Sequence, residues 1–274
     1  PLPARGQWMS RIEPGHADAK VAYLAVDAHR AGDYRPLLFR TADLGRTWQG
    51  VASDLPGDGP VKVVREDPAN PDVLYAGTEF GLFVTLDRGG HWAALGDLPT
   101  VAVDDILVHP RDRDLVVATH GRSLYILDDA APLARITPAV VAAKAHLFPP
   151  RPAQGWYPLP GFADWAGTSG FYRGANPPEG AILTYWVKED LAEPVKIAIE
   201  GPGGKPVAHL TGSARAGINR ITWDLMPTKD LLNEYGGEGK KFVAAGEYKV
   251  TLTYADAKSE QTLKVEIAPG VETR

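Results

Sequence analysis

The sequence predicts an all-β protein in which C-terminal blades of a β-propeller are followed by an immunoglobulin-like β-sandwich. Three observations support this fold class. A short motif recurs after about 44 residues, the length of one four-stranded propeller blade. The 274 residues include 29 Gly and 24 Pro, and segments with helical periodicity are nearly absent, as in chains built from many short strands and turns. The last third of the chain alternates apolar and polar residues, which is typical of half-buried strands.

The recurring motif reads Thr41-Ala-Asp-Leu-Gly-Arg-Thr-Trp48 in its first copy and Thr85-Leu-Asp-Arg-Gly-Gly-His-Trp92 in its second. Its shared positions are Asp43, Gly45 and Trp48, which align with Asp87, Gly89 and Trp92. In such a turn the aspartate accepts backbone hydrogen bonds, the glycine adopts a positive φ, and the tryptophan packs the turn against the sheet. Because each carboxylate is occupied by its own turn, we interpret both aspartates as structural.

Strand-like segments recur in the same order in three consecutive modules. Each inner strand ends at or near a proline, at Pro14, Pro68 and Pro110, and a proline cannot donate a sheet hydrogen bond. Residues 7–9 are expected to form the last strand of a preceding blade. The strands expected in the modules are 10–14, 20–26 and 36–41, then 61–65, 72–76 and 81–85, and finally 103–108, 114–119 and 123–127.

The three modules, residues 1–130, predict an incomplete ring. The third module reaches Asp128-Asp129 without a copy of the motif and without an outermost strand. Propellers usually have four to eight blades and close on themselves, which protects their strand edges. We therefore expect the remaining blades to come from an upstream segment or from another chain.

Residues 131–179 are expected to connect the two domains. Their alanine-rich beginning, residues 130–145, is compatible with a short helix or an extended crossing. The following segment is dense in Pro, Gly and aromatic residues. It is either an ordered strap packed between domains or an aromatic platform for sugar rings. The aromatic residues concerned are Phe148, Trp156, Tyr157, Phe162, Trp165, Phe171 and Tyr172.

Residues 180–268 predict the sandwich. Apolar and polar side chains alternate through residues 195–200, 246–254 and 262–267, so one face of each strand is buried. Residues 181–187, 207–210 and 219–224 complete about six strands, separated by turn signals such as Gly201-Pro-Gly-Gly204. The insertion at 228–241 is compatible with one helical turn followed by a Gly-rich loop.

The repeated motif resembles the Asp-box (S/T-x-D-x-G-x-T-W) of sialidase-like and sortilin-like propellers. Residues 176–186, 217–224 and 245–250 resemble a C-terminal module of large exported bacterial proteins with sortilin/VPS10-like or BNR-repeat propellers. The elements Gly-x-Asn-Arg-x-x-Trp-Asp and Ala-Gly-x-Tyr resemble the FlgD-type Ig-like fold. This resemblance implies an extracellular or periplasmic location. It does not imply an activity, because the glycosyl hydrolase label of this group rests on a structural motif.

Candidate functional residues lie in loops that open on one face of a propeller near its channel. Glu79, Asp104 and Asp105 are the candidate catalytic carboxylates, since paired carboxylates can serve as acid and base in glycoside hydrolysis. His120 and Arg122 are expected at a ligand-binding rim. A carboxylate–His set could also hold a divalent cation. The competing interpretation is that these loops are polar only because they are solvated.

Composition excludes several classes of function. The formal net charge is −5 with both signs interspersed, which argues against nucleic acid or an anionic membrane as a partner. Apolar runs fall short of the roughly 20 residues that cross a bilayer. The chain has no cysteine, so disulfides and thiolate metal sites are excluded. Because the motifs for nucleotide binding, zinc proteases, Ca²⁺ loops and serine hydrolases are also missing, we expect no cofactor and no metal.

These observations favour a protein- or glycan-binding or scaffold module of an exported bacterial propeller protein. The alternative is a glycoside hydrolase or lyase that acts on extracellular polysaccharide. A third possibility is a subunit whose blades complete the propeller of another chain.

Overall fold

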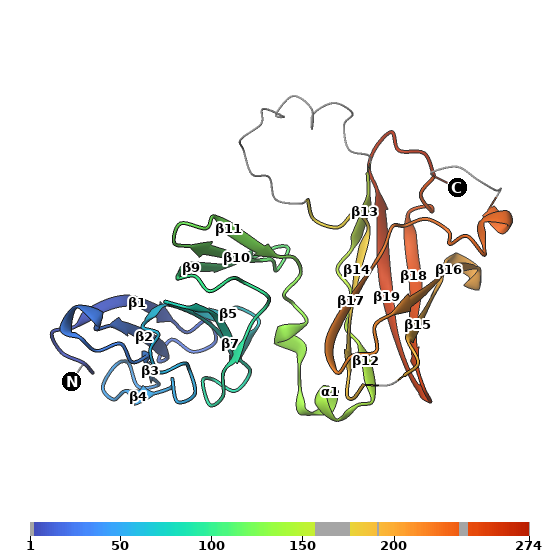
Figure 1. The fold of residues 1–274 in the computed structure, drawn as a ribbon. Coiled ribbons are helices and arrows are strands. Elements are labelled where there is room, and N and C mark those ends of the chain that lie inside the picture. The colour runs from blue at the N-terminus through green and yellow to red at the C-terminus, as the bar shows by residue number, and fades with distance from the viewer. Residues whose placement is uncertain (1–2, 157–175, 191, 236–240, 274) are drawn as a thin grey trace. The chain divides into compact units, whose positions relative to one another are not determined.

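The computed structural model describes residues 3–156, 176–190, 192–235 and 241–273. The chain divides into two compact units, residues 1–136 and 137–274 (Figure 1). Both units consist of sheets in which nearly all strands pair antiparallel, with short helical turns between them, which confirms the all-β prediction. Among the described residues, no helix is both long enough and apolar enough to cross a membrane.

The first unit consists of three sheets, each formed by strands that are consecutive in the chain. Neighbouring strands in each sheet pair antiparallel, so each sheet is a meander of the kind that forms a propeller blade. A one-turn helix, η1 (His29–Ala31), joins β2 to β3. The first sheet contains β1 (Trp8–Pro14), β2 (Ala22–Asp27), β3 (Leu37–Thr41) and β4 (Gln49–Gly50). The second contains β5 (Val61–Asp67), β6 (Asn70–Thr78), β7 (Gly81–Thr85) and β8 (Ala93–Ala94). The third contains β9 (Val103–Val108), β10 (Leu115–Thr119) and β11 (Leu124–Leu127).

The repeat alignment places the first three strands of each module to within a few residues, but it does not predict the short fourth strands β4 and β8. One prediction is wrong, because residues 8 and 9 do not belong to a preceding sheet. They begin β1, where Trp8 pairs with Asp27 and Met9 with Val26. Within the described residues the third sheet has three strands, as the missing motif predicts.

Apolar clusters lie between successive sheets of the first unit. Val64 and Leu74 of the second sheet pack with Leu38 of the first, and Val63 and Tyr75 pack in a separate cluster with residues of the third. The close approach of the second and third sheets depends on Gly77 in β6. A Cβ at this position would lie 2.6 Å from methyl groups of both Val63 and Val103. Any larger residue would therefore push these two sheets apart.

The first and third sheets each expose apolar side chains whose structural equivalents between the sheets are buried. Strand pairing makes Leu124 and Ile126 of β11 equivalent to Leu82 and Val84 of β7. Leu82 and Val84 are 5% and 7% exposed, because the third sheet covers them, whereas Leu124 and Ile126 are 63% and 61% exposed. Ile12, on β1, is also exposed, although its equivalents Val64 and Ile106 are buried.

The second unit is a two-sheet β-sandwich. One sheet has the order β12 (Ala145–Leu147), β14 (Ala181–Val187) and β17 (Gly217–Trp223). The other has the order β13 (Ala153–Gly155), β19 (Ala257–Ile267), β18 (Gly246–Tyr254), β15 (Val195–Glu200) and β16 (Pro206–Gly212). All pairs are antiparallel except β13 with β19. The short helices are η2 (Leu133–Arg135), α1 (Pro138–Ala142), η3 (Pro202–Gly204) and η4 (Leu232–Tyr235), of which η2 lies in the first unit.

The sandwich core is formed by side chains from both sheets. Trp223 of β17 meets Tyr248 of β18, with ring centroids 5.6 Å apart, and Tyr185 of β14 is fully buried beside them. The predicted helical turn of the 228–241 insertion is confirmed as η4.

The stretch predicted as a connection contributes two strands, β12 and β13, to the sandwich sheets. Phe148 is fully buried, with the ring of His146 edge-on at 5.0 Å, whereas Trp156 is 40% exposed. The remaining aromatic residues of the proposed strap or platform, Tyr157, Phe162, Trp165, Phe171 and Tyr172, lie outside the described residues.

Candidate functional site

The same irregularity occurs in all three inner strands of the first unit. The pairing of β1 with β2 skips Ser10, that of β5 with β6 skips Lys62, and that of β9 with β10 skips Asp104. Each skipped residue is a β-bulge, an extra residue that is left out of the ladder and re-aims its side chain. Three sheets therefore present a polar side chain from the same structural position.

A second set of equivalent residues follows the strand opposite each bulge. Asp27 ends β2, Glu79 follows β6, and His120 follows β10, each one residue beyond the partner of the residue before the bulge. The backbone N–H of Glu79 donates to the Pro60 carbonyl oxygen at 3.1 Å, and that of His120 donates to the Ala102 carbonyl oxygen at 2.9 Å. These hydrogen bonds fix the two residues in the same way. We call the six residues the polar rim: Ser10, Asp27, Lys62, Glu79, Asp104 and His120.

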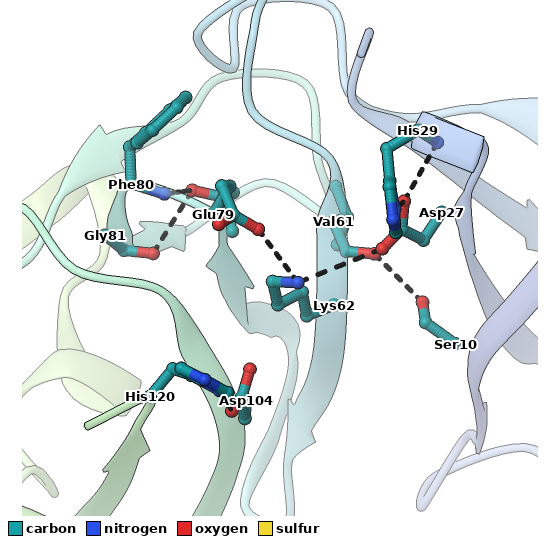
Figure 2. Close-up of polar contacts among 11 residues, drawn as sticks. Ser10, Asp27, His29, Val61, Lys62, Glu79, Phe80, Gly81, Asp104 and His120 are labelled. Carbon is teal, nitrogen blue, oxygen red and sulfur yellow. Dashed lines mark hydrogen bonds and ion pairs between the residues drawn. The ribbon is translucent and has the colours of Figure 1, made fainter. Parts of the chain in front are cut away.

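Ion pairs and hydrogen bonds connect the polar rim within and between sheets (Figure 2). Lys62 Nζ lies 2.8 Å from Glu79 Oε2 on its own sheet and 3.9 Å from Asp27 Oδ2 on the preceding one. His120 Nδ1 lies 3.0 Å from Asp104 Oδ2. Ser10 Oγ donates to the Val61 carbonyl oxygen at 2.9 Å, which joins the first sheet to the second. Figure 2 shows these side chains gathered at neighbouring strand ends.

Electrostatics at the polar rim centre on Lys62. Burial alone would lower the pKa of this ammonium group, but its bond to Glu79 and the charges of Glu79, Asp27 and Asp104 outweigh burial and raise the pKa. Burial would raise the pKa of Asp27, yet hydrogen bonds from the ring and backbone of His29, with the nearby charges of His29 and Lys62, lower it. His29 Nδ1 lies 2.6 Å from Asp27 Oδ1. The charges of Glu79, Asp27 and Asp104 thus all act on the single lysine of the polar rim, so the rim has more carboxylates than ammonium groups.

The three candidate catalytic carboxylates have different partners. Glu79 and Asp104 belong to the polar rim, whereas Asp105 does not. Asp105 Oδ1 accepts from Arg11 at 2.6 Å and from Arg65 at 2.8 Å. Arg65 also donates to Glu13 at 2.7 Å and to the Ile106 carbonyl oxygen at 2.6 Å, so this second network joins β1, β5 and β9. Asp104 and Asp105, although adjacent, therefore belong to separate networks.

The other predicted rim residue, Arg122, is exposed in the turn between β10 and β11. Within the ranges that the structure describes, no group of three His, Asp or Glu side chains has the arrangement of a metal site.

The two motif turns have the same hydrogen bonds. The Thr41 hydroxyl donates to Asp43, and Asp43 Oδ1 accepts from the Thr47 backbone N–H at 2.9 Å. In the second copy Thr85 and His91 replace Thr41 and Thr47, at 2.7 and 2.8 Å from Asp87. The glycines of both turns, Gly45 and Gly89, have φ of 78° and 91°. The aspartates are thus occupied within their own turns.

The sequence predicted Glu79, Asp104 and His120 as functional residues but not the other three members of the polar rim. Ser10, Asp27 and Lys62 sit on strands or their ends, where polar residues are read as the solvent face. The bulges would have indicated Ser10 and Lys62, because aligning the strand pairs of the modules leaves one unpaired residue in each inner strand.

No protein-family profile matches the sequence, and no curated protein matches it. Among solved structures, YCF48 bound to D1 peptide is 14% identical with a TM-score of 0.35, over 47% of this chain and 39% of that one. A GH74 enzyme from Niastella koreensis is 12% identical with a TM-score of 0.37, over 92% and 46%. A GH74 xyloglucanase from Xanthomonas campestris is 15% identical with a TM-score of 0.34, over 94% and 47%. The chain spans less than half the length of each of these proteins.

Proposed function

We propose that this chain is a protein- or glycan-binding or scaffold module of an exported bacterial protein, which acts outside the cytoplasm. Residues 1–130 supply blades of an Asp-box β-propeller, and the two-sheet second unit is an Ig-like domain. The observation that carries this proposal is the polar rim. Three blades present charged or hydroxyl side chains at equivalent bulges and strand ends, all at the same end of the strand pairs.

A rim of this kind suits recognition. Its side chains come from strand ends rather than long loops, and a hydrogen bond and an ion pair between sheets hold them in place. Binding groups on rigid elements lose little conformational entropy when a ligand arrives. The excess of carboxylates at the polar rim favours a ligand that presents hydroxyl or cationic groups.

The alternative proposal is a glycoside hydrolase or lyase that uses Glu79, Asp104 and Asp105. Glycoside hydrolysis needs two carboxyl groups on opposite sides of one bond. Asp104 and Asp105 belong to separate networks, and Glu79 is bound to Lys62. This arrangement favours binding over acid–base chemistry.

The proposed partners include further blades, from an upstream segment or a second chain. The exposed apolar residues of β1 and β11 support this proposal, because their equivalents inside the unit are buried. The buried Trp48 Nε1 supports it further. This atom has no hydrogen-bond partner in the described structure, whereas the equivalent Trp92 Nε1 donates to Val51 of the preceding module.

The proposal is tested with arrays of polysaccharides and extracellular proteins. We expect retention on at least one ligand without release of reducing sugar. Glu79→Gln and Asp104→Asn should weaken that retention by about tenfold, the effect of losing one charged hydrogen bond. The matched control is Asp97→Asn, an exposed carboxylate outside the polar rim.

Two results would contradict the proposal. One is release of reducing sugar that is lost with Asp105→Ala or Glu79→Ala, which would establish the hydrolase. The other is retention that the two rim variants leave unchanged, which would place the binding surface elsewhere.

A further inference from the structure

Two cavities at the junction of the first and second sheets share the side chains of Arg40 and Arg88. The larger has a volume of about 410 Å³ and is also lined by Gln49, Ser53 and Asp87. The smaller, about 190 Å³, extends toward Tyr23 and Glu66. We call the two together the Arg40 groove. Its larger part alone has the volume of a small-molecule site.

The Arg40 groove lies at the opposite end of the strands from the polar rim. On β3, Leu37 pairs with Val26, next to the rim residue Asp27, whereas Arg40 pairs with Tyr23 near the other end of β2. Arg88 belongs to the turn that follows β7. The groove is therefore a separate surface from the one proposed above for recognition.

The carboxylates around the groove already have partners. Arg88 forms an ion pair with Asp72. The Asp87 oxygens accept from Thr85 and from both the backbone and the ring of His91. Asp18 accepts from the Lys20 backbone N–H at 2.9 Å, which fixes its own loop.

Glu66 accepts from the Tyr23 hydroxyl at 2.9 Å and from the His16 backbone N–H at 2.5 Å. Burial, the charge of Glu66 and the hydrogen bond to it raise the pKa of Tyr23 to about 12, against the opposing hydrogen bond and positive charge of Arg40. Tyr23 therefore stays protonated and supplies no negative charge to Arg40.

Arg40 is the cation of the groove that lacks an acidic partner. Within the described part of the chain no carboxylate lies within ion-pair distance of its guanidinium, and its Nε is buried without a hydrogen-bond acceptor. An unpaired buried donor on a charged group is costly, and an anionic ligand would remove that cost.

The fold itself does not require arginine at this position. Strand pairing makes Arg40 equivalent to Val84 in the second sheet and to Ile126 in the third, and both are apolar. Val84 packs in the cluster between sheets, as a blade requires. A cation in place of this packing residue points to a role other than packing.

From these observations we propose that the Arg40 groove binds the carboxylate group of a small ligand. The guanidinium presents parallel N–H groups that match the two oxygens of a carboxylate. Arg88 lines the same groove, but its charge is already paired with that of Asp72, so the carboxylate is assigned to Arg40. Gln49 and Ser53 offer hydrogen bonds to neutral groups of the ligand.

The experiment titrates the protein calorimetrically with sodium glucuronate, with glucose as the uncharged match and N-acetylglutamate as a second carboxylate. We expect glucuronate to bind and glucose not to bind, which identifies an acidic sugar. Binding of N-acetylglutamate but not glucuronate would support the same carboxylate site with an acidic amino acid as its ligand. Failure of both carboxylates to bind would overturn the proposal.

Three variants locate the binding. Arg40→Gln should lower the affinity of the protein for the carboxylate ligand by about tenfold or more. Ser53→Phe fills the larger cavity from an exposed position without changing charge, so it tests the site even if Arg40→Gln fails to fold. The control is Arg111→Gln, an exposed arginine of the third module. Binding that survives both groove variants would refute the assignment, whereas Asp104→Asn at the polar rim should leave it unchanged.

Discussion

The indole Nε1 of Trp92 donates a hydrogen bond of 2.8 Å to the carbonyl oxygen of Val51, 41 residues earlier in the chain. The motif turn of the second module is thereby fastened to the end of the first. Gly89 of the same turn approaches Val51 so closely that a Cβ would lie 2.7 Å from its carbonyl oxygen. Trp92 and Gly89 therefore both hold the second module against Val51 at the end of the first.

Replacing Trp92 with Phe should destabilise the first unit. The variant loses this hydrogen bond and leaves the Val51 carbonyl oxygen without that donor, at a cost of about 1 kcal/mol or more in the free energy of unfolding. Trp48→Phe is the matched control, because the Trp48 Nε1 has no acceptor in the described structure. Urea denaturation of both variants measures the difference, and equal losses would contradict the prediction.

Asp87→Asn should reduce stability most between about pH 4 and pH 6.5. Burial would raise the pKa of Asp87, but hydrogen bonds from His91 and Thr85 outweigh burial and lower it to about 2. The same contact raises the pKa of His91. A lowered carboxyl pKa stabilises the fold above the unfolded value near 4, and a raised histidine pKa stabilises it below the unfolded value near 6.5.

Asp43→Asn is the comparison for this pH profile. The pKa of Asp43 is also lowered to about 2, chiefly by hydrogen bonds from Thr47, which does not titrate. Its contribution should therefore persist above pH 6.5, while that of Asp87 declines. Thermal denaturation of wild type and both variants from pH 2 to 8 separates the two profiles. Parallel profiles would show that the His91 contact adds nothing.

Lys62→Met should raise the pKa of Asp27. The lysine charge is one of the influences that hold this pKa below its ordinary value, and methionine keeps the length of the side chain without the charge. The titration of the Asp27 carboxyl carbon by NMR measures the change. Lys249→Met, at an ion pair with Glu200 in the second unit, should leave Asp27 unaffected.

Arg65→Met should destabilise the first unit by about 3 kcal/mol, the lower end of the range for breaking a largely buried ion pair. The substitution removes the cation that joins Glu13, Asp105 and the Ile106 carbonyl oxygen. Adding Glu13→Gln should recover part of the loss, since the buried charge is then gone. Arg11→Met should cost less, because Asp105 keeps Arg65. A double variant no more stable than Arg65→Met alone would argue against this account.

The repeated order of the modules was enough to place three strands of each module, although the short strands β4 and β8 were missed. β7 and β9 have the predicted bounds, because Gly81 and Val103 begin short apolar runs bounded by turn residues. In the second unit β15 and β18 also begin and end where their alternating patterns predict, and β14 has the bounds expected for it. Local periodicity determines such strands directly.

Features that depend on pairing between strands were not predictable in this way. Adjacent residues such as Asp104 and Asp105 look like one acidic pair in the sequence. A bulge at Asp104, visible only from the register of β9 against β10, assigns them to different networks. Arg40 likewise reads as an ordinary exposed strand residue until the register aligns it with Val84 and Ile126.

The bulges in the three inner strands also bear on how this protein could change its specificity. Serine, lysine and aspartate occupy the same position in successive sheets, although they differ in size and charge. A residue excluded from the ladder has no partner in the backbone pairing of its sheet, so its replacement leaves that strand pairing intact, although the side-chain contacts of Ser10, Lys62 and Asp104 are lost. Under the binding function proposed above, mutational libraries confined to residues 10, 62 and 104 would vary ligand preference while the strand pairing is kept.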